Sequence, residues 1–164
     1  MREVLKENDV TNNWAVSAAS PVRKCCSRAP VAVSRDALLH EVARLMRDED
    51  ISCVLVGERE ELVSIVTERD LTDALARGLG GDAPVTEIAT ANPLTVSADA
   101  TVRNAAALML HYGVRHLVVT ENNRAVGVIS ARDALATLVR TDNPQTFVAM
   151  VHQALTARPD CWWG

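Results

Sequence analysis

The chain has 164 residues, of which 48% are hydrophobic and 23% are charged, and its formal net charge is −4 at pH 7. The hydrophobic share predicts a folded core and excludes a chain that is disordered throughout, and the acidic balance argues against a general nucleic-acid-binding protein. No hydrophobic run approaches the roughly 20 residues of a membrane-spanning helix. The first residues lack the apolar segment of a secretion signal, so we expect a cytoplasmic protein.

The first 20 residues are polar and irregular. A short helix over residues 3–7 is predicted there, followed by a loop that Trp14 anchors. Cysteine use is sparse, because the chain holds only Cys25, Cys26, Cys53 and Cys161. No pair has the spacing of a zinc site, so we expect free thiols in a reducing compartment and no metal.

From Pro21 onward the chain repeats itself. Residues 21–77 align with residues 84–140 at a constant offset of 63 without a gap, and 17 of the 57 aligned pairs are identical. A repeat of this length indicates two copies of one supersecondary unit. Residues 78–83, rich in glycine, are predicted to be a flexible connector between the copies.

Each copy predicts the order β-α-β-β-α after a short helical turn at its first proline. Apolar residues three and four positions apart predict the central amphipathic helix. Thr101 is the expected N-cap of the second such helix, with Asn104 three residues on, whereas Leu38 cannot cap, so the first should start weakly or earlier. The predicted strands are 31–33, 53–56 and 62–66 in the first copy and 94–96, 116–120 and 125–129 in the second, with closing helices at 71–77 and 134–140.

The two later strands of each copy are nearly continuous in valine, leucine and isoleucine. Such strands are usually covered on both faces. Because the helices of one unit can cover only one side of its sheet, the two units should pack against each other. Asn122 and Asn123, between the last two strands, can both take positive φ and predict a hairpin turn.

Residues 141–164 follow the repeats. Asp142-Asn143-Pro144 is a good helix start, because it combines a capping residue with proline at the first helical position. A helix over residues 145–157 is expected to dock on the repeats or on a partner. Trp162-Trp163 could form a docking element, or could cover the protein's own apolar surface or a dimer seam.

Each copy also ends its last strand in the same chemical pattern, a hydroxyl followed three residues later by an aspartate. These pairs are Thr67 with Asp70 and Ser130 with Asp133. A structural interpretation is a helix-capping pair. A functional one is a ribose site, because a carboxylate accepts hydrogen bonds from two adjacent ribose hydroxyls.

Together these features resemble a tandem pair of CBS (cystathionine β-synthase) domains, also called a Bateman module. The resemblance covers residues 21–140 and is carried by Pro30-Val31-Ala32-Val33, Pro93-Leu94-Thr95-Val96, Leu45-Met46, Leu108-Met109, Gly113-Val114-Arg115-His116 and the run from Val126 to Asp133. It implies an α+β fold in which two β-α-β-β-α repeats pack with pseudo-two-fold symmetry. It also implies two clefts that bind AMP, ADP or ATP, with S-adenosylmethionine or NAD as alternatives, and a flat homodimer.

The resemblance implies that Thr67, Asp70, Ser130 and Asp133 contact the ligand. It also places Arg115, His116 and Arg132 near the phosphates or the base, where arginine suits phosphate. Arg132 could equally be a solvated or ion-paired surface residue, and His116 a half-buried strand histidine. The acidic turn at residues 48–50 is expected to crowd Thr67 and Asp70, so the cleft built on Asp133 should hold a charged nucleotide better.

Three function classes remain open. The leading hypothesis is a free-standing adenine-nucleotide sensor that needs no cofactor and alters association with itself or with an unknown protein partner. An enzyme is not expected, because the sequence has no nucleophile–base set, Walker loop or HExxH motif. The third hypothesis is a structural or interaction module whose clefts stay empty.

Overall fold

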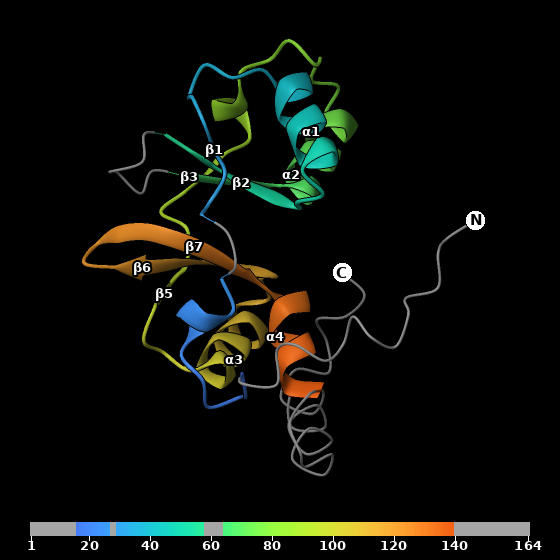
Figure 1. Cartoon of the computed structure of the whole chain (residues 1–164). Helices are drawn as coiled ribbons and strands as arrows, with labels where there is room; N and C mark the ends of the chain where they lie inside the picture. The colour runs from blue at the N-terminus through green and yellow to red at the C-terminus, as the bar shows by residue number, and fades with distance from the viewer. Residues whose placement is uncertain (1–15, 27–28, 58–63, 140–164) are drawn as a thin grey trace.

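The computed structural model describes residues 16–26, 29–57 and 64–139, and it forms two α+β units whose sheets face each other (Figure 1). The upper unit of the figure carries helices α1 and α2, and the lower unit carries α3 and α4. The elements in chain order are η2 (Val22–Lys24), β1 (Ala32–Val33), α1 (Leu39–Asp48), β2 (Cys53–Val56), β3 (Ser64–Thr67), α2 (Glu68–Ala76), η3 (Val85–Glu87), β4 (Thr90–Ala91), β5 (Thr95–Ser97), α3 (Val102–Tyr112), β6 (His116–Glu121), β7 (Arg124–Ser130) and α4 (Ala131–Val139).

The two sheets have the same topology where the repeats correspond. Their strand orders are β1-β2-β3-β4 and β5-β6-β7. The first strand of each copy pairs parallel to the second, and the second pairs antiparallel to the third. The predicted order β-α-β-β-α is therefore confirmed in both copies. Strand β4 was not predicted; it is two exposed residues long and pairs with β3, so its formation depends on that partner and not on a local pattern.

The opening turn of the first repeat packs in the second unit, where the blue start of the chain lies beside α3 (Figure 1). Val22 is fully buried in one core cluster with Leu117 and Ile129. The amides of Val22 and Arg23 donate hydrogen bonds to the carbonyls of Ala100 and Ala98, at 2.8 and 3.1 Å. The second unit is thus completed by residues from the start of the first repeat.

The opening turn of the second repeat makes the reciprocal contact. Val85 is fully buried with Val42 and Val66 of the first unit. Its amide donates to the carbonyl of Ala37 at 2.8 Å, and the amide of Leu39 donates to that of Ala83 at 3.0 Å. The two opening turns therefore exchange places, as pseudo-two-fold symmetry requires.

A separate apolar cluster joins the sheets of the two units. Its buried members are Leu55, Ile65 and Val118, with Val128 packed against them. Leu55 and Val118 occupy corresponding positions of the repeat, as do Ile65 and Val128. The pseudo-two-fold axis therefore passes near this cluster. The expectation that the strands are covered on both faces is confirmed for β2 and β6, whereas Val126 of β7 is exposed.

Local signals at the helix starts and the hairpin are mostly confirmed. The Thr101 hydroxyl accepts from the amide of Asn104 at 3.1 Å and caps α3. Helix α1 has no side-chain cap at Leu38; it begins at the position that corresponds to the start of α3, so the expectation of an earlier start is wrong. Asn122 and Asn123 have φ of 51° and 62°, as the hairpin turn requires.

The closing helices α2 and α4 begin three residues earlier than predicted, directly after the strand-end hydroxyls. The helices predicted over residues 3–7 and 145–157 and the pair at 162–163 lie outside the described residues. Within the described ranges, no helix combines the length and apolarity needed to cross a membrane.

Candidate functional site

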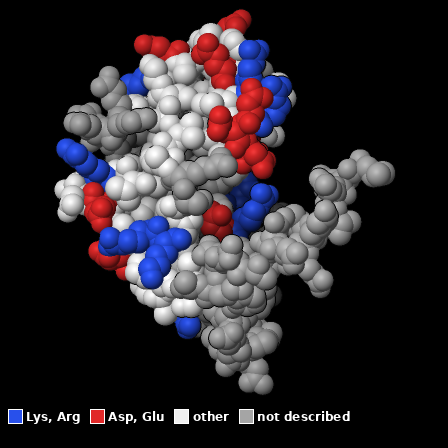
Figure 2. All heavy atoms as spheres, in the orientation of Figure 1, with Lys and Arg blue, Asp and Glu red and all other residues white. Residues whose placement is uncertain are grey.

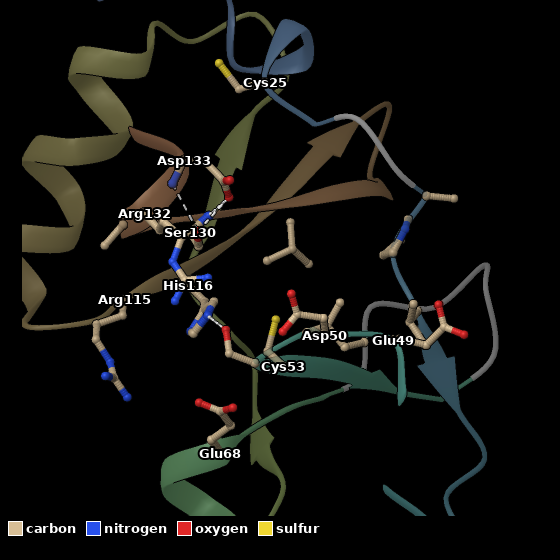
Figure 3. Close-up of a pocket in the computed structure, with 17 residues that line it drawn as sticks. Cys25, Glu49, Asp50, Cys53, Glu68, Arg115, His116, Ser130, Arg132 and Asp133 are labelled. Atoms are coloured by element: carbon tan, nitrogen blue, oxygen red, sulfur yellow. Dashed lines mark hydrogen bonds between the residues drawn. The ribbon is translucent and has the colours of Figure 1, made fainter. Parts of the chain in front are cut away.

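A cavity of about 550 Å³ lies where the two units meet, and both repeats line it (Figure 3). The second repeat contributes the end of β7, the start of α4 and the start of β6. The first repeat contributes the turn after α1, the start of β2 and the start of α2. Five predicted site residues line this one cavity, namely Arg115, His116, Ser130, Arg132 and Asp133.

Ser130 and Asp133 form a closed local network at the wall of the cavity. The Ser130 hydroxyl and amide both donate to Asp133 Oδ2, at 2.6 and 2.9 Å. The Asp133 amide donates back to Ser130 Oγ at 3.2 Å. The capping interpretation is therefore correct for Oδ2. Within the described residues Oδ1 has no hydrogen bond, which leaves a carboxylate oxygen for a ligand.

The first copy repeats this network elsewhere. The Thr67 hydroxyl and amide both donate to Asp70 Oδ2 at 2.7 Å. Neither Thr67 nor Asp70 lines the cavity of Figure 3. The structure thus gathers the five second-copy site residues and leaves the first-copy pair outside their cavity.

His116 links the two repeats at the inner end of the cavity. Its Nε2 lies 2.7 Å from Ser52 Oγ. Burial lowers the pKa of His116, the adjacent Arg115 lowers it further, and the carboxylate of Asp133 opposes the change. A neutral imidazole in this hydrogen bond is the form favoured near neutral pH.

Two thiols in this region are held in the protonated form, Cys53 in the cavity lining and Cys26 outside it. Burial, followed by the negative charges of Asp133 and Glu68, raises the pKa of Cys53 to about 11. Burial is also the main reason that the pKa of Cys26 is raised to about 11. A thiol with such a pKa stays protonated at neutral pH and reacts slowly. Among the residues that the structure describes, no three histidine, cysteine or acidic side chains converge as a metal site.

The family model for the CBS domain matches residues 22–77 and 85–140. The chain belongs to the CBS domain family. Its two matched segments are adjacent copies, so it carries a CBS pair. An uncharacterised protein of Methanocaldococcus jannaschii is 29% identical over 113 residues, which cover 66% of this chain and 61% of that relative.

Solved structures of CBS pairs have the same fold. A CBS domain protein from Pyrobaculum aerophilum, complexed with AMP, is 27% identical and superposes with a TM-score of 0.67 over 80% of this chain and 98% of its own. The CBS domain pair of protein MJ0100, in complex with 5′-methylthioadenosine and S-adenosyl-L-methionine, is 25% identical, with a TM-score of 0.66 over 71% of this chain and 98% of its own. Both relatives thus bind compounds that contain adenosine.

One sequence-based expectation for this CBS pair is wrong. The acidic turn was expected to crowd Thr67 and Asp70, but Glu49 and Asp50 line the cavity of Asp133. The reason is that each cavity wall combines both repeats, so a turn of the first copy faces the last strand of the second.

Sequence reasoning also missed Cys53 and Glu68 as lining residues of this CBS pair. The repeat itself carried a signal for them. Cys53 is the residue of the first repeat that corresponds to His116 of the second. When the two repeats pack with their sheets facing each other, these two positions line the same cavity. The missing step was the cross-repeat packing, which no local pattern specifies.

Proposed function

We propose that this CBS pair is a regulatory module that binds an adenosine-containing small molecule in the Asp133 cavity. Binding would change how the protein associates with itself or with a protein partner. The observation that carries this function is the cavity itself, because it places an available carboxylate oxygen, two arginines and apolar side chains around one space between the repeats.

The volume and the lining suit such a ligand. A cavity of about 550 Å³ lies within the usual range of small-molecule sites. Asp133 Oδ1 can accept from the paired hydroxyls of a ribose while Oδ2 stays in its capping network. Val31, Ile51 and Val128 supply apolar surface for a base. The adenosine compounds bound by two related CBS pairs agree with this assignment.

A ligand in this position would touch both repeats. Since the walls come from two separate units, occupancy favours the relative arrangement in which those walls fit the ligand. Such a preference is the differential affinity that a regulatory change of conformation requires. The regulated partner would then respond to the ligand without contacting it.

Thermal unfolding with a panel of adenosine, AMP, ADP, ATP, NAD and S-adenosylmethionine tests this function. A ligand at 100 times its Kd stabilises a protein by about 2.7 kcal/mol, or roughly 5 to 10 °C for a domain of this size. Asp133→Asn should remove the shift, and Asp36→Asn, an exposed carboxylate outside the cavity, should retain it. No shift with any compound, or an unchanged shift in Asp133→Asn, would count against the proposal.

Self-association is supported by a different observation. Leu75 on α2 and Leu135 on α4 are 76% and 50% exposed, on the corresponding closing helices of the two repeats. Exposed large apolar side chains favour contact with another protein surface. We therefore propose a homodimer through these helices. Sedimentation velocity should give a dimer for the native chain and a monomer for the Leu75→Lys, Leu135→Lys variant.

A further inference from the structure

The Asp133 cavity contains more negative than positive charge. Its lining includes four carboxylates, from Glu49, Asp50, Glu68 and Asp133, and two guanidinium groups, from Arg115 and Arg132. The imidazole of His116 adds no positive charge near neutral pH, because its pKa is lowered. In Figure 2, acidic atoms on the right side of the upper unit reach the level where the two units meet, and basic atoms adjoin them there.

The close-up shows how these groups are directed (Figure 3). In this view the Asp50 carboxylate lies beside Cys53 on the side that faces His116, and the Glu68 carboxylate lies on the other side of His116 from Asp133. The guanidinium of Arg115 extends away from Asp133. Two carboxylates of the first repeat thus line the same cavity as Asp133, on the side of His116 and Cys53, and the guanidinium of Arg115 is directed away from Asp133.

These carboxylates are not neutralised by neighbours. Asp50 and Glu68 form no ion pair with any residue of the described ranges. The fold does not require carboxylates at these two positions, because the corresponding positions of the second copy hold Gly113 and Ala131. Asp50 even occupies the left-handed region, with φ of 51°, where the second copy has glycine. The added charge therefore belongs to one side of the pseudo-symmetric pair.

We propose that Asp50 and Glu68 set the charge selectivity of the Asp133 cavity, which takes adenosine derivatives whose 5′ substituent is uncharged or cationic and disfavours di- and triphosphates. This inference rests on the proposed function and specifies its ligand class. Each phosphate added to the ligand brings negative charge into a space that already carries carboxylates, and the repulsion grows with the number of charges. A sulfonium or thioether at the same position avoids that repulsion.

Isothermal titration calorimetry with 5′-methylthioadenosine, AMP, ADP and ATP tests the proposal, in EDTA at low ionic strength. The native chain, Asp50→Asn, Glu68→Gln and the double variant are compared. Binding that disappears in Asp133→Asn is assigned to this cavity. Asp48→Asn is the matched control, because Asp48 is an exposed carboxylate two residues before Asp50 and lies outside the cavity lining.

The native chain should bind 5′-methylthioadenosine at least about tenfold more tightly than ATP. The double variant should tighten ATP binding by roughly tenfold, with a change below about twofold for 5′-methylthioadenosine. Asp48→Asn should change the affinity for ATP and for 5′-methylthioadenosine by less than about twofold. In 300 mM salt the gain in ATP affinity of the double variant should be smaller, because exposed charges are screened.

Two results would overturn the proposal alone. One is binding of ATP that is as tight as binding of 5′-methylthioadenosine in the native cavity. The other is an unchanged preference in the double variant. Absence of binding by every compound would instead overturn the proposed function, and the selectivity with it.

Discussion

Gly127 on strand β7 lies so close to Cys26 that one added carbon atom would clash with it. A Cβ at Gly127 would lie 2.9 Å from Cys26 Cβ and 3.0 Å from Cys26 Sγ. Rotation of the thiol cannot relieve the first contact, because Cβ is fixed by the backbone. Gly127→Ala must therefore displace strand β7 or the segment that carries Cys26, and such overpacking costs about 1 to 3 kcal/mol.

Urea unfolding followed by far-ultraviolet circular dichroism measures this cost. A loss of about 2 kcal/mol lowers the midpoint by roughly 1 M for a urea slope near 2 kcal/mol/M. Cys26→Gly removes both contacting atoms, so Gly127→Ala in that background should cost less than about 0.5 kcal/mol. The difference between the two costs is the coupling energy of the pair. Gly80→Ala is the control, since an added Cβ there meets no atom within 4 Å.

Two results would refute the steric reasoning. One is a Gly127→Ala midpoint equal to that of the native chain. The other is an equal cost of Gly127→Ala with and without Cys26→Gly, because the clash would then lie with another group. A loss in Gly80→Ala as large as that in Gly127→Ala would point to a general effect of replacing glycine.

The remaining predictions concern capping, protonation and reactivity. Thr101→Ala removes the acceptor for the Asn104 amide and should cost about 1 kcal/mol in urea unfolding, with Thr101→Ser close to native. Burial and Arg115 lower the pKa of His116 below 6.5, so the unfolded chain binds its proton first and stability falls as pH decreases from 6.5 toward that lower pKa. The decline between pH 7.5 and 5.5 should therefore be smaller in His116→Asn. Cys53, with its pKa raised to about 11, should react with iodoacetamide at least about a hundredfold more slowly than free cysteine at pH 7.5, as mass spectrometry would show.

Local patterns predicted much of the fold. The offset of 63 gave the element order of both copies, and residue chemistry predicted the Thr101 cap and the Asn122–Asn123 turn. These features depend on neighbours within a few positions along the chain. The closing helices began earlier than expected because the capping networks at Thr67 and Ser130 start them directly at the strand ends.

The arrangement of the cavity was less predictable. The sequence placed Arg115 and Asp133 in one site, because both belong to the second copy. It assigned the acidic turn to the wrong cleft, since Asp50 precedes Asp70 by only 20 residues yet lines the cavity of Asp133. The position of the acidic turn therefore depends on how the two units pack, which local patterns do not specify. The prediction that the Asp133 cleft holds a charged nucleotide better rested in part on that turn, so this argument for it no longer holds.

The exchanged opening turns have a consequence for how the protein can be divided. Val22 completes the core around Leu117, and Val85 completes the core around Val42. A chain cut within residues 78–83 would give two fragments, each lacking a piece of its own interior and carrying a piece of the other's. Each copy therefore takes part of its core from the other copy, so unfolding of one unit removes part of the core of the other.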